Sequence, residues 1–265
     1  LDKPANVAEI LVNSSNIGSA LIAERIGPKT QKHYFDLLEL TKKPNLPLLE
    51  VSKPIFNRKW PKLTSITASY GYGIAVSPIQ LASAISCIFN DGKFISPKLI
   101  KNKNEIIEKR VFSKKTSLTM RKLARAVVTH PDGSGKKADA YGYLVGGKTG
   151  TAEIISNTGG FKKNANLSSF IGAFPINDPK ILILVLIEEP KPQFQKLKHR
   201  YTTGGQVAAP VVRKIVQKIA PILNVQPIVK NLPKIEQTLK LDILDDNLKV
   251  KNASLWFQNS RSNFT

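Results

Sequence analysis

This chain has 265 residues, and the feature that most constrains its fold is the order in which helix-like and strand-like patterns of apolar residues follow one another. Apolar residues recur at helical spacing over 6–26, 79–89 and 116–129, and again over 206–223. Between these regions lie three strand-like runs: Leu144–Ile154, Ser168–Phe174 and Ile181–Glu188. The links between the runs are short and rich in turn residues, which favours an antiparallel meander. Helices, then three strands, then a helix predict an α+β domain in which the two kinds of element are segregated.

Local signals place several helix ends. The region 6–26 is helical on both sides of a polar break, so Ser14–Asn16 is expected at a helix–helix junction. Ser77 followed by Pro78 is typical of a helix start, because serine caps the first turn and proline suits the first helical position. In the last helix, Pro210 is expected in the first turn.

Three segments lack a clear period. Residues 43–62 are rich in proline and lysine and are predicted to be a surface excursion, and Asp132–Lys137 is predicted to be a flexible glycine loop. The segment 226–265 is weakly periodic and mixed in charge. We therefore expect one domain over 1–225, followed by a tail at 226–265 to which the sequence assigns no chemistry.

The chain carries a large positive charge, with 40 Lys and Arg against 19 Asp and Glu and a formal net charge of +21. Such an excess suits nucleic acid, an anionic membrane surface or an anionic polymer such as cell wall. The basic residues are mostly lysine and are scattered, whereas proteins that read bases rely on arginine and on concentrated basic segments. We therefore expect no nucleic-acid partner, and a solvated lysine coat that faces an anionic compartment.

Cysteine and histidine give no metal or redox signal. Cys87 stands alone in an apolar helical pattern and is predicted to be a small core residue, and the histidines lack metal-ligand spacing. No metal and no cofactor are expected. The longest apolar run, Ile181–Ile187, is far shorter than the roughly 20 residues of a membrane helix. Because the first residue is leucine, we expect the chain to begin inside a longer protein, with any membrane anchor upstream.

The strongest chemical signal is Gly146–Ala152, which reads Gly-Gly-Lys-Thr-Gly-Thr-Ala on a predicted strand. Small residues on a strand let the backbone of a peptide substrate pair along it. Lys148 would place a positive charge beside the reacting group, and the hydroxyls of Thr149 and Thr151 could bind a carboxylate. The purely structural alternative is a strand made flexible by its glycines, with a lysine exposed to solvent.

Two segments of the chain match motifs that are common by chance. Gly142–Thr149 satisfies the Walker A spacing, but a strand and a loop follow it where a phosphate-binding loop requires a helix. Ser14–Asn16 is an S-x-N triplet, and such triplets are common because Ser and Asn both cap helices. An NTPase is therefore disfavoured, and the S-x-N triplet gains meaning only from the residues around it.

Taken in order, S-x-N and K-T-G are two of the three motifs of penicillin-binding proteins and serine β-lactamases. The chain resembles class B penicillin-binding proteins, with the division-specific branch nearest, over residues 5–225. The segments that carry the resemblance are EILVNSSNIGSALIAERIG, SYGYGIAVSPIQLASA, GGKTGTAE and SSFIGAFPINDP. The resemblance implies the C-terminal part of a transpeptidase domain, with an antiparallel sheet flanked by helices.

The resemblance also implies roles for particular residues in D,D-transpeptidation, in which a serine attacks the D-Ala–D-Ala end of a peptidoglycan stem peptide. Ser14 matches the residue that relays a proton to the leaving amine, and Asn16 matches the amide that holds the substrate backbone. Lys148 matches the lysine that supplies positive potential. Three residues match the part of the motif that binds the substrate carboxylate and lends a backbone N–H to the oxyanion hole: Thr149, Gly150 and Thr151.

The third motif departs from the family pattern. S-x-x-K, which carries the nucleophile and precedes S-x-N in the family, is absent from the 13 residues before Ser14. The S-x-x-K at Ser134–Lys137 lies after S-x-N in a glycine loop and is interpreted as a chance match. The resemblance therefore implies a nucleophile upstream of this chain. The alternatives are a catalytically dead remnant of such a protein, and a D,D-carboxypeptidase or β-lactamase of the same fold.

By the same resemblance, the partners are peptidoglycan stem peptides, β-lactams as inhibitors, a glycosyltransferase acting on lipid-linked precursors, and division proteins. The implied location is the periplasmic face of the bacterial inner membrane. Two strands of the family's five-stranded sheet, together with the S-x-x-K helix, would also lie upstream. Their absence would leave Ile181–Glu188 as an unpaired apolar edge, so we expect the chain on its own to be poorly soluble or inactive.

Overall fold

The computed structural model describes residues 5–100, 108–156, 159–191 and 202–241. Helices dominate the first half of the chain: α1 (Val7–Val12), α2 (Asn16–Ile26), α3 (Pro28–Leu37), α4 (Lys62–Ala68), α5 (Pro78–Phe89) and α6 (Lys114–Thr129). Short antiparallel strand pairs interrupt them: β1 (Ile55–Phe56) with β2 (Ile74–Ala75), and β3 (Lys93–Ile95) with β4 (Glu108–Arg110). The rest is η1 (Lys136–Ala138), the sheet β5 (Gly146–Ile155), β6 (Phe161–Phe174) and β7 (Ile181–Glu188), then α7 (Gly204–Ile222) and α8 (Leu232–Leu239).

The three long strands form the predicted antiparallel meander, in the order β5-β6-β7. Lys148 is paired with Ile171 and Thr151 with Ser168, so the K-T-G segment lies against the middle of β6. β6 begins at Phe161, seven positions before the predicted start. The segment before Ser168 has no apolar alternation to announce a strand, but its backbone pairs with the end of β5, from Asn166 to Phe161.

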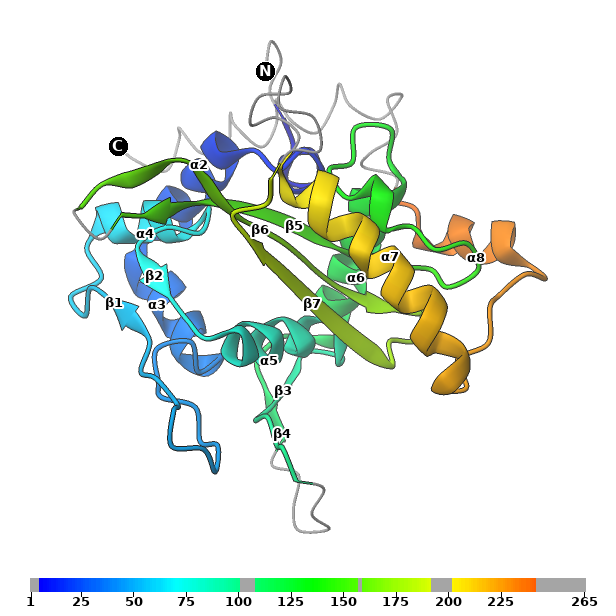
Figure 1. Cartoon of the computed structure of the whole chain (residues 1–265), viewed down its shortest axis with the longest axis horizontal. Helices are drawn as coiled ribbons and strands as arrows, with labels where there is room; N and C mark the ends of the chain where they lie inside the picture. Colours follow the sequence, from blue (N-terminus) through cyan, green and yellow to red (C-terminus); the bar gives the residue numbers. More distant parts are fainter. Residues whose placement is uncertain (1–4, 101–107, 157–158, 192–201, 242–265) are drawn as a thin grey trace, which may run out of the picture.

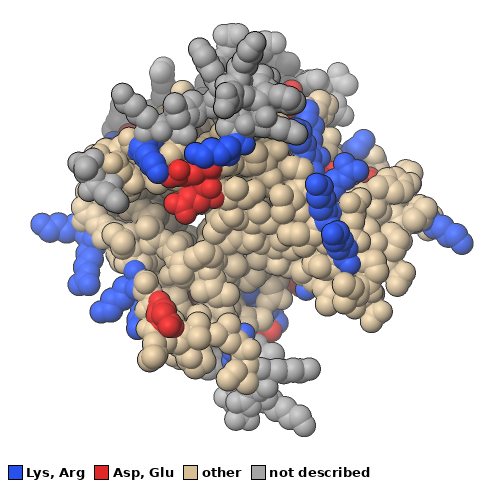
Figure 2. Space-filling view, viewed as in Figure 1, with Lys and Arg blue, Asp and Glu red and all other residues tan. Residues whose placement is uncertain are grey.

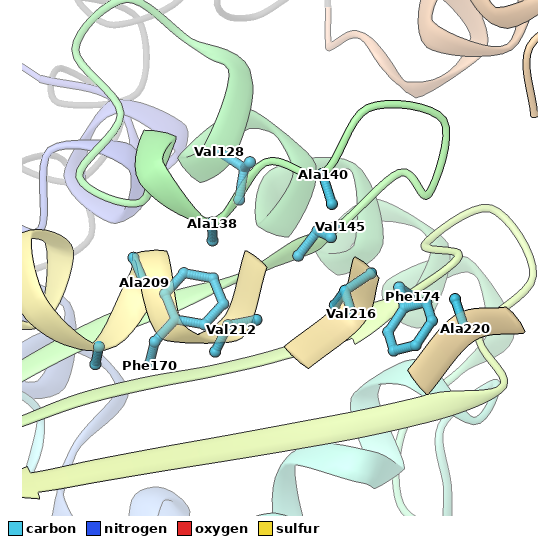
Figure 3. Close-up of a cluster of buried hydrophobic side chains, with 11 residues drawn as sticks. Val128, Ala138, Ala140, Val145, Phe170, Phe174, Ala209, Val212, Val216 and Ala220 are labelled. Atoms are coloured by element: carbon cyan, nitrogen blue, oxygen red, sulfur yellow. The ribbon is translucent and has the colours of Figure 1, made fainter. Parts of the chain in front are cut away.

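One face of the sheet packs against α7, which runs along its near side in Figure 1. The side chains of Phe170 and Phe174 are fully buried between sheet and helix, and burial on this scale stabilises by roughly 1.5–3 kcal/mol per side chain. Figure 3 shows the buried cluster that they form with small and branched residues: Val128, Ala138, Ala140, Val145, Ala208, Ala209, Val212, Val216 and Ala220. Pro210 lies in the second turn of α7, not the first, because the helix begins at Gly204.

The other face of the sheet packs against α5 and α6, and Figure 1 shows α6 behind the sheet. α5 begins as predicted at Ser77 and Pro78, with a capping box in which Ser77 and Gln80 satisfy each other's backbone groups. Cys87 is fully buried, which confirms its role as a small core residue. The core on this side also contains apolar residues from the segment before β5, the β6–β7 link and α8: Leu144, Ile176 and Leu239.

The helices α2, α3 and α4 pack on one another beside one end of the sheet, as Figure 1 shows, and α1 packs against both α2 and α6. The predicted surface excursion at 43–62 is mostly irregular, but it returns to the core at Trp60, which is 3% exposed. The indole Nε1 of Trp60 donates to Gln31 Oε1 at 2.9 Å, and Gln31 Nε2 donates to the Ser65 carbonyl at 2.9 Å. These buried bonds join α3, α4 and the excursion into one unit.

Two of the irregular segments have more structure than the sequence indicates. The predicted glycine loop at Asp132–Lys137 runs into the 3-10 helix η1, and Ala138 packs under α7. Residues 226–241 of the tail include α8, with Leu239 buried; residues 242–265 lie outside the described part of the chain.

The surface is basic but has no concentrated basic patch on the face shown in Figure 2. Its most regular feature there is a row over α7, to which Arg213, Lys214 and Lys218 contribute exposed side chains. Among the described helices, none is both long and apolar enough to cross a bilayer. In the described part of the chain β7 is paired on one side only, with β6, so its other edge is open.

Candidate active site

The S-x-N and K-T-G segments meet at one point, where Lys148 Nζ donates to Ser14 Oγ at 2.6 Å. Ser14 lies in the predicted junction between α1 and α2, and its φ of 56° is in the left-handed region. The next residue, Ser15, caps α2 by accepting from the Gly18 backbone N–H at 3.1 Å. A Cβ at Gly18 would lie 2.5 Å from the Ile10 side chain, so glycine lets the two helices pack close enough to form this tight turn.

Lys148 is held at the base of this junction by more than Ser14. Its Nζ also donates to the Thr149 carbonyl at 3.1 Å and lies 3.4 Å from Thr149 Oγ1. Burial lowers the pKa of Lys148 to about 8. Near neutral pH a small but significant fraction of the amine is therefore neutral, and a neutral amine carries a lone pair that can accept a proton.

Thr149 is positioned by Ser134. The two hydroxyls, Ser134 Oγ and Thr149 Oγ1, are 2.8 Å apart. Lys137, the lysine of the S-x-x-K match, does not contact Ser134 and donates to the side chain of Gln206 on α7. Ser134 also lies in the turn just before the 3-10 helix η1, not at the N-terminus of an α-helix, and its hydroxyl pairs with Thr149, so this match does not assemble a serine–lysine pair.

Thr151 is positioned by the beginning of α7. The backbone N–H of Gly204 donates to Thr151 Oγ1 at 3.0 Å. Because this bond uses the oxygen as an acceptor, the hydroxyl proton of Thr151 stays available to a second, anionic partner. A Cβ at Gly204 would lie 2.2 Å from the Ser169 carbonyl oxygen and 2.4 Å from that of Gly150. Only glycine allows the helix to approach β5 and β6 this closely.

The remaining predicted residues lie on the same elements. Gly150 is paired with Ser169 of β6, and a Cβ on it would lie 2.5 Å from Ser169 Oγ. Asn16 is the first residue of α2, two positions after Ser14, and its side chain is exposed. The structure thus joins Ser14, Lys148 and Thr149 directly, and places Thr151 farther along the same strand.

Sequence reasoning missed three neighbours of this site. Ser134 and Gly204 hold the two threonine hydroxyls, and Tyr72 Oη accepts from the Glu153 backbone N–H at 3.1 Å, beyond the K-T-G segment. Tyr72 also packs edge-on against Phe161. The Gly-Gly pair at the start of α7 was a signal for a close backbone approach, whereas nothing in the sequence pairs Tyr72 with β5.

The comparisons with known proteins agree with this geometry. The family model described as "Penicillin binding protein transpeptidase domain" matches residues 1–217. The "Probable peptidoglycan D,D-transpeptidase FtsI" of Caulobacter vibrioides is 37% identical over 230 residues, which are 83% of this chain. The chain spans only 38% of the length of that relative.

Solved structures give the same result. The transpeptidase domain of penicillin-binding protein 3 from Burkholderia pseudomallei is 31% identical with a TM-score of 0.74, and the match covers 84% of this chain and 66% of that one. Penicillin-binding protein 3 of Mycobacterium tuberculosis, solved in complex with ampicillin, shares the fold at 23% identity, with a TM-score of 0.75 over 87% of this chain and 54% of that one. The family model and these relatives show that the chain belongs to the penicillin-binding protein transpeptidase family, in its class B branch.

Proposed function

We propose that these residues form the receiving half of a serine D,D-transpeptidase site, and that the nucleophilic serine of an S-x-x-K motif lies upstream of them. The observation that carries this proposal is the 2.6 Å contact between Lys148 Nζ and Ser14 Oγ, which joins two family motifs separated by 134 positions. A lysine with a lowered pKa beside a serine hydroxyl is the arrangement required for proton transfer in acyl transfer.

In this mechanism the substrate peptide lies along β5. The substrate carboxylate would accept hydrogen bonds from Thr149 and Thr151, whose hydroxyls are already oriented by Ser134 and by Gly204. The backbone N–H of Thr151 would supply one donor of the oxyanion hole, and such donors contribute roughly 3 kcal/mol of transition-state stabilisation in related acyl transfers.

The proton of the leaving amine would come through Ser14. When the upstream serine attacks the peptide carbonyl, it would form the ester bond and give its proton to the lysine of its own S-x-x-K motif. The C–N bond then breaks, and the D-alanine amine takes a proton from the Ser14 hydroxyl, which is replaced from protonated Lys148. The charge of Lys148 would also stabilise the bound carboxylate and the developing oxyanion. Asn16, exposed at the start of α2, would hold the substrate backbone by its amide.

We propose D-Ala–D-Ala stem peptides of peptidoglycan as substrates and β-lactams as inhibitors, on the strength of the family and of the name of the Caulobacter relative. The name of the same relative supports a role in cell division. As partners we propose a glycosyltransferase acting on lipid-linked precursors and other division proteins, on the strength of the family resemblance alone. The periplasmic face of the inner membrane is the location that suits these substrates. The net charge of +21 would favour contact with an anionic wall there.

The proposal is tested by the rate at which the complete gene product is acylated by a fluorescent penicillin. Lys148→Met and Ser14→Ala should each lower this rate by about a hundredfold, because each removes one step of the proton path. Lys214→Met, an exposed lysine on α7, is the matched control and should leave the rate unchanged. Acylation of the Lys148→Met variant at the wild-type rate would refute the proposed role of this pair.

A further inference from the structure

Residues 226–241 lie beyond the 1–217 range matched by the family model, and they are bound closely to the segment that leads into β5. The Ile228 N–H donates to the Gly142 carbonyl at 2.7 Å. α8 then packs against α6 and the buried cluster that includes Leu144 and Ile176, with Leu239 only 9% exposed. This arrangement makes residues 226–241 part of the folded domain.

A buried arginine connects α8 to the start of β5. The Arg125 side chain, on α6, is only 5% exposed, and its Nη1 donates to the Val145 carbonyl at 2.6 Å and to Asp139 Oδ1 at 2.8 Å. Its other two nitrogens both bind Glu236 of α8, with Nε donating to Oε2 at 3.2 Å and Nη2 donating to Oε1. Glu236 therefore binds the Arg125 guanidinium with both of its carboxylate oxygens.

The position of the Val145 carbonyl makes this contact relevant to the site. Val145 immediately precedes Gly146 and Gly147, which have no side chains to fix the strand. Lys148 follows these two glycines. Burial alone lowers the pKa of Arg125, but the ion pairs with Glu236 and Asp139 outweigh burial and raise that pKa. A buried guanidinium deprived of one carboxylate would have to move towards water, and its hydrogen bond to Val145 would be lost with that movement.

We propose that Glu236 is a positioning residue that acts through Arg125 and the Val145 carbonyl to fix the start of β5, and with it Lys148. The inference rests on the proposed function only for the chemical role of Lys148. Among the described residues, the hydrogen bonds of Glu236 go to Arg125 and not to the residues of the candidate site. Through Glu236, residues 226–241 would help to hold the K-T-G strand β5 in place.

The test compares three variants of the complete gene product. Glu236→Ala removes both oxygens, Glu236→Gln keeps one acceptor without the charge, and Gln237→Ala changes the exposed neighbour on α8 as a matched control. Amide hydrogen exchange is measured over 144–149 and, for reference, over Ile181–Glu188. Glu236→Ala should lower protection over 144–149 by about tenfold while β7 stays unchanged, with Glu236→Gln intermediate and Gln237→Ala without effect.

A second readout is the kinetics of acylation by penicillin. Misplacement of Lys148 should lower the acylation rate constant by about tenfold and leave the non-covalent affinity within about twofold. Unchanged protection in both Glu236 variants, or an equal loss of protection in β5 and β7, would overturn the inference. If Glu236→Ala does not fold, Glu236→Gln decides by the same comparison. Exchange requires no chemistry, so a gene product that is never acylated would refute the proposed function and leave this inference to be judged by its own data.

Discussion

Lys148 Nζ lies 2.6 Å from Ser14 Oγ, and this single contact ties the strand β5 to the turn between α1 and α2. Each of the two residues is held in place by its own element. Ser14 is held by the capped start of α2, and Lys148 by the strand pairing of β5 with β6. The chemistry that the pair can perform depends on the protonation state of the lysine, and this state can be measured directly.

We predict that the Lys148 amine titrates near pH 8, because burial lowers its pKa to about 8. Burial penalises the charged form, so between pH 8 and the usual lysine pKa of about 10.4 the folded state releases a proton that the unfolded chain keeps. The contribution of Lys148 to stability therefore rises with pH across this window. Competitive acetylation measured by mass spectrometry should give Lys148 a midpoint near pH 8, whereas a midpoint at the usual lysine pKa would contradict the burial argument.

Thr151→Val should remove the hydroxyl that Gly204 orients and leave the Gly204 N–H without its acceptor. We predict that the second-order rate of acylation by penicillin falls by about tenfold or more, since a charge-assisted hydrogen bond to the ligand carboxylate is lost. Thr151→Ser keeps the hydroxyl and should stay within about threefold of the wild type. Equal rates for the valine and serine variants would show that the hydroxyl does not bind the ligand.

Gly204→Ala should destabilise the domain, because the new Cβ would lie 2.2 Å from the Ser169 carbonyl oxygen. Forced overpacking of this kind costs about 1–3 kcal/mol, and the backbone atoms involved cannot rotate away. Gln217→Ala, at an exposed position of the same helix, is the control. Thermal melts should show a drop of several degrees for Gly204→Ala alone, and a melt equal to that of the wild type would mean that α7 can shift at no cost.

The open edge of β7 predicts how the 265-residue chain behaves when produced alone. A charge on an exposed edge strand discourages pairing between molecules, so Leu186→Lys should raise the soluble fraction. Leu186 is 38% exposed, and the control Ile222→Lys changes an apolar residue that is 77% exposed at the end of α7. If both variants gain equally, surface hydrophobicity and not the strand edge is responsible. A wild-type chain that is monomeric and melts cooperatively would contradict the prediction altogether.

Much of the fold could be predicted because its signals are local. The polar break at Ser14–Asn16, the Ser77-Pro78 helix start and the apolar run at Ile181–Glu188 each depend on a few neighbouring residues, and the structure confirms all three. The early start of β6 was missed because the segment before Ser168 becomes a strand only by pairing with β5. Propensity cannot show a pairing that is imposed by the partner strand.

In the candidate site, too, the features with local signals could be predicted and those created by long-range contacts could not. Lys148 and the flanking glycines could be found by motif, and so could the S-x-N serine. The partners that orient them come from segments far away in sequence: Ser134 for Thr149, Gly204 for Thr151, and Glu236 for Arg125. Those contacts are created when the loop before η1 and the helix α7 pack on the sheet and α8 packs on α6. A single sequence does not show which surfaces will pack together.

The central claim is that these residues receive a substrate and that the acylated serine is not one of them. The most direct measurement is to react both the 265-residue chain and the complete gene product with a penicillin, digest each, and map the acylated residue by mass spectrometry. We predict no acylation of the chain alone, and a single acylated serine of an upstream S-x-x-K motif in the complete product. An acyl group on Ser134, on Ser14 or on any other residue of these 265 would contradict the account.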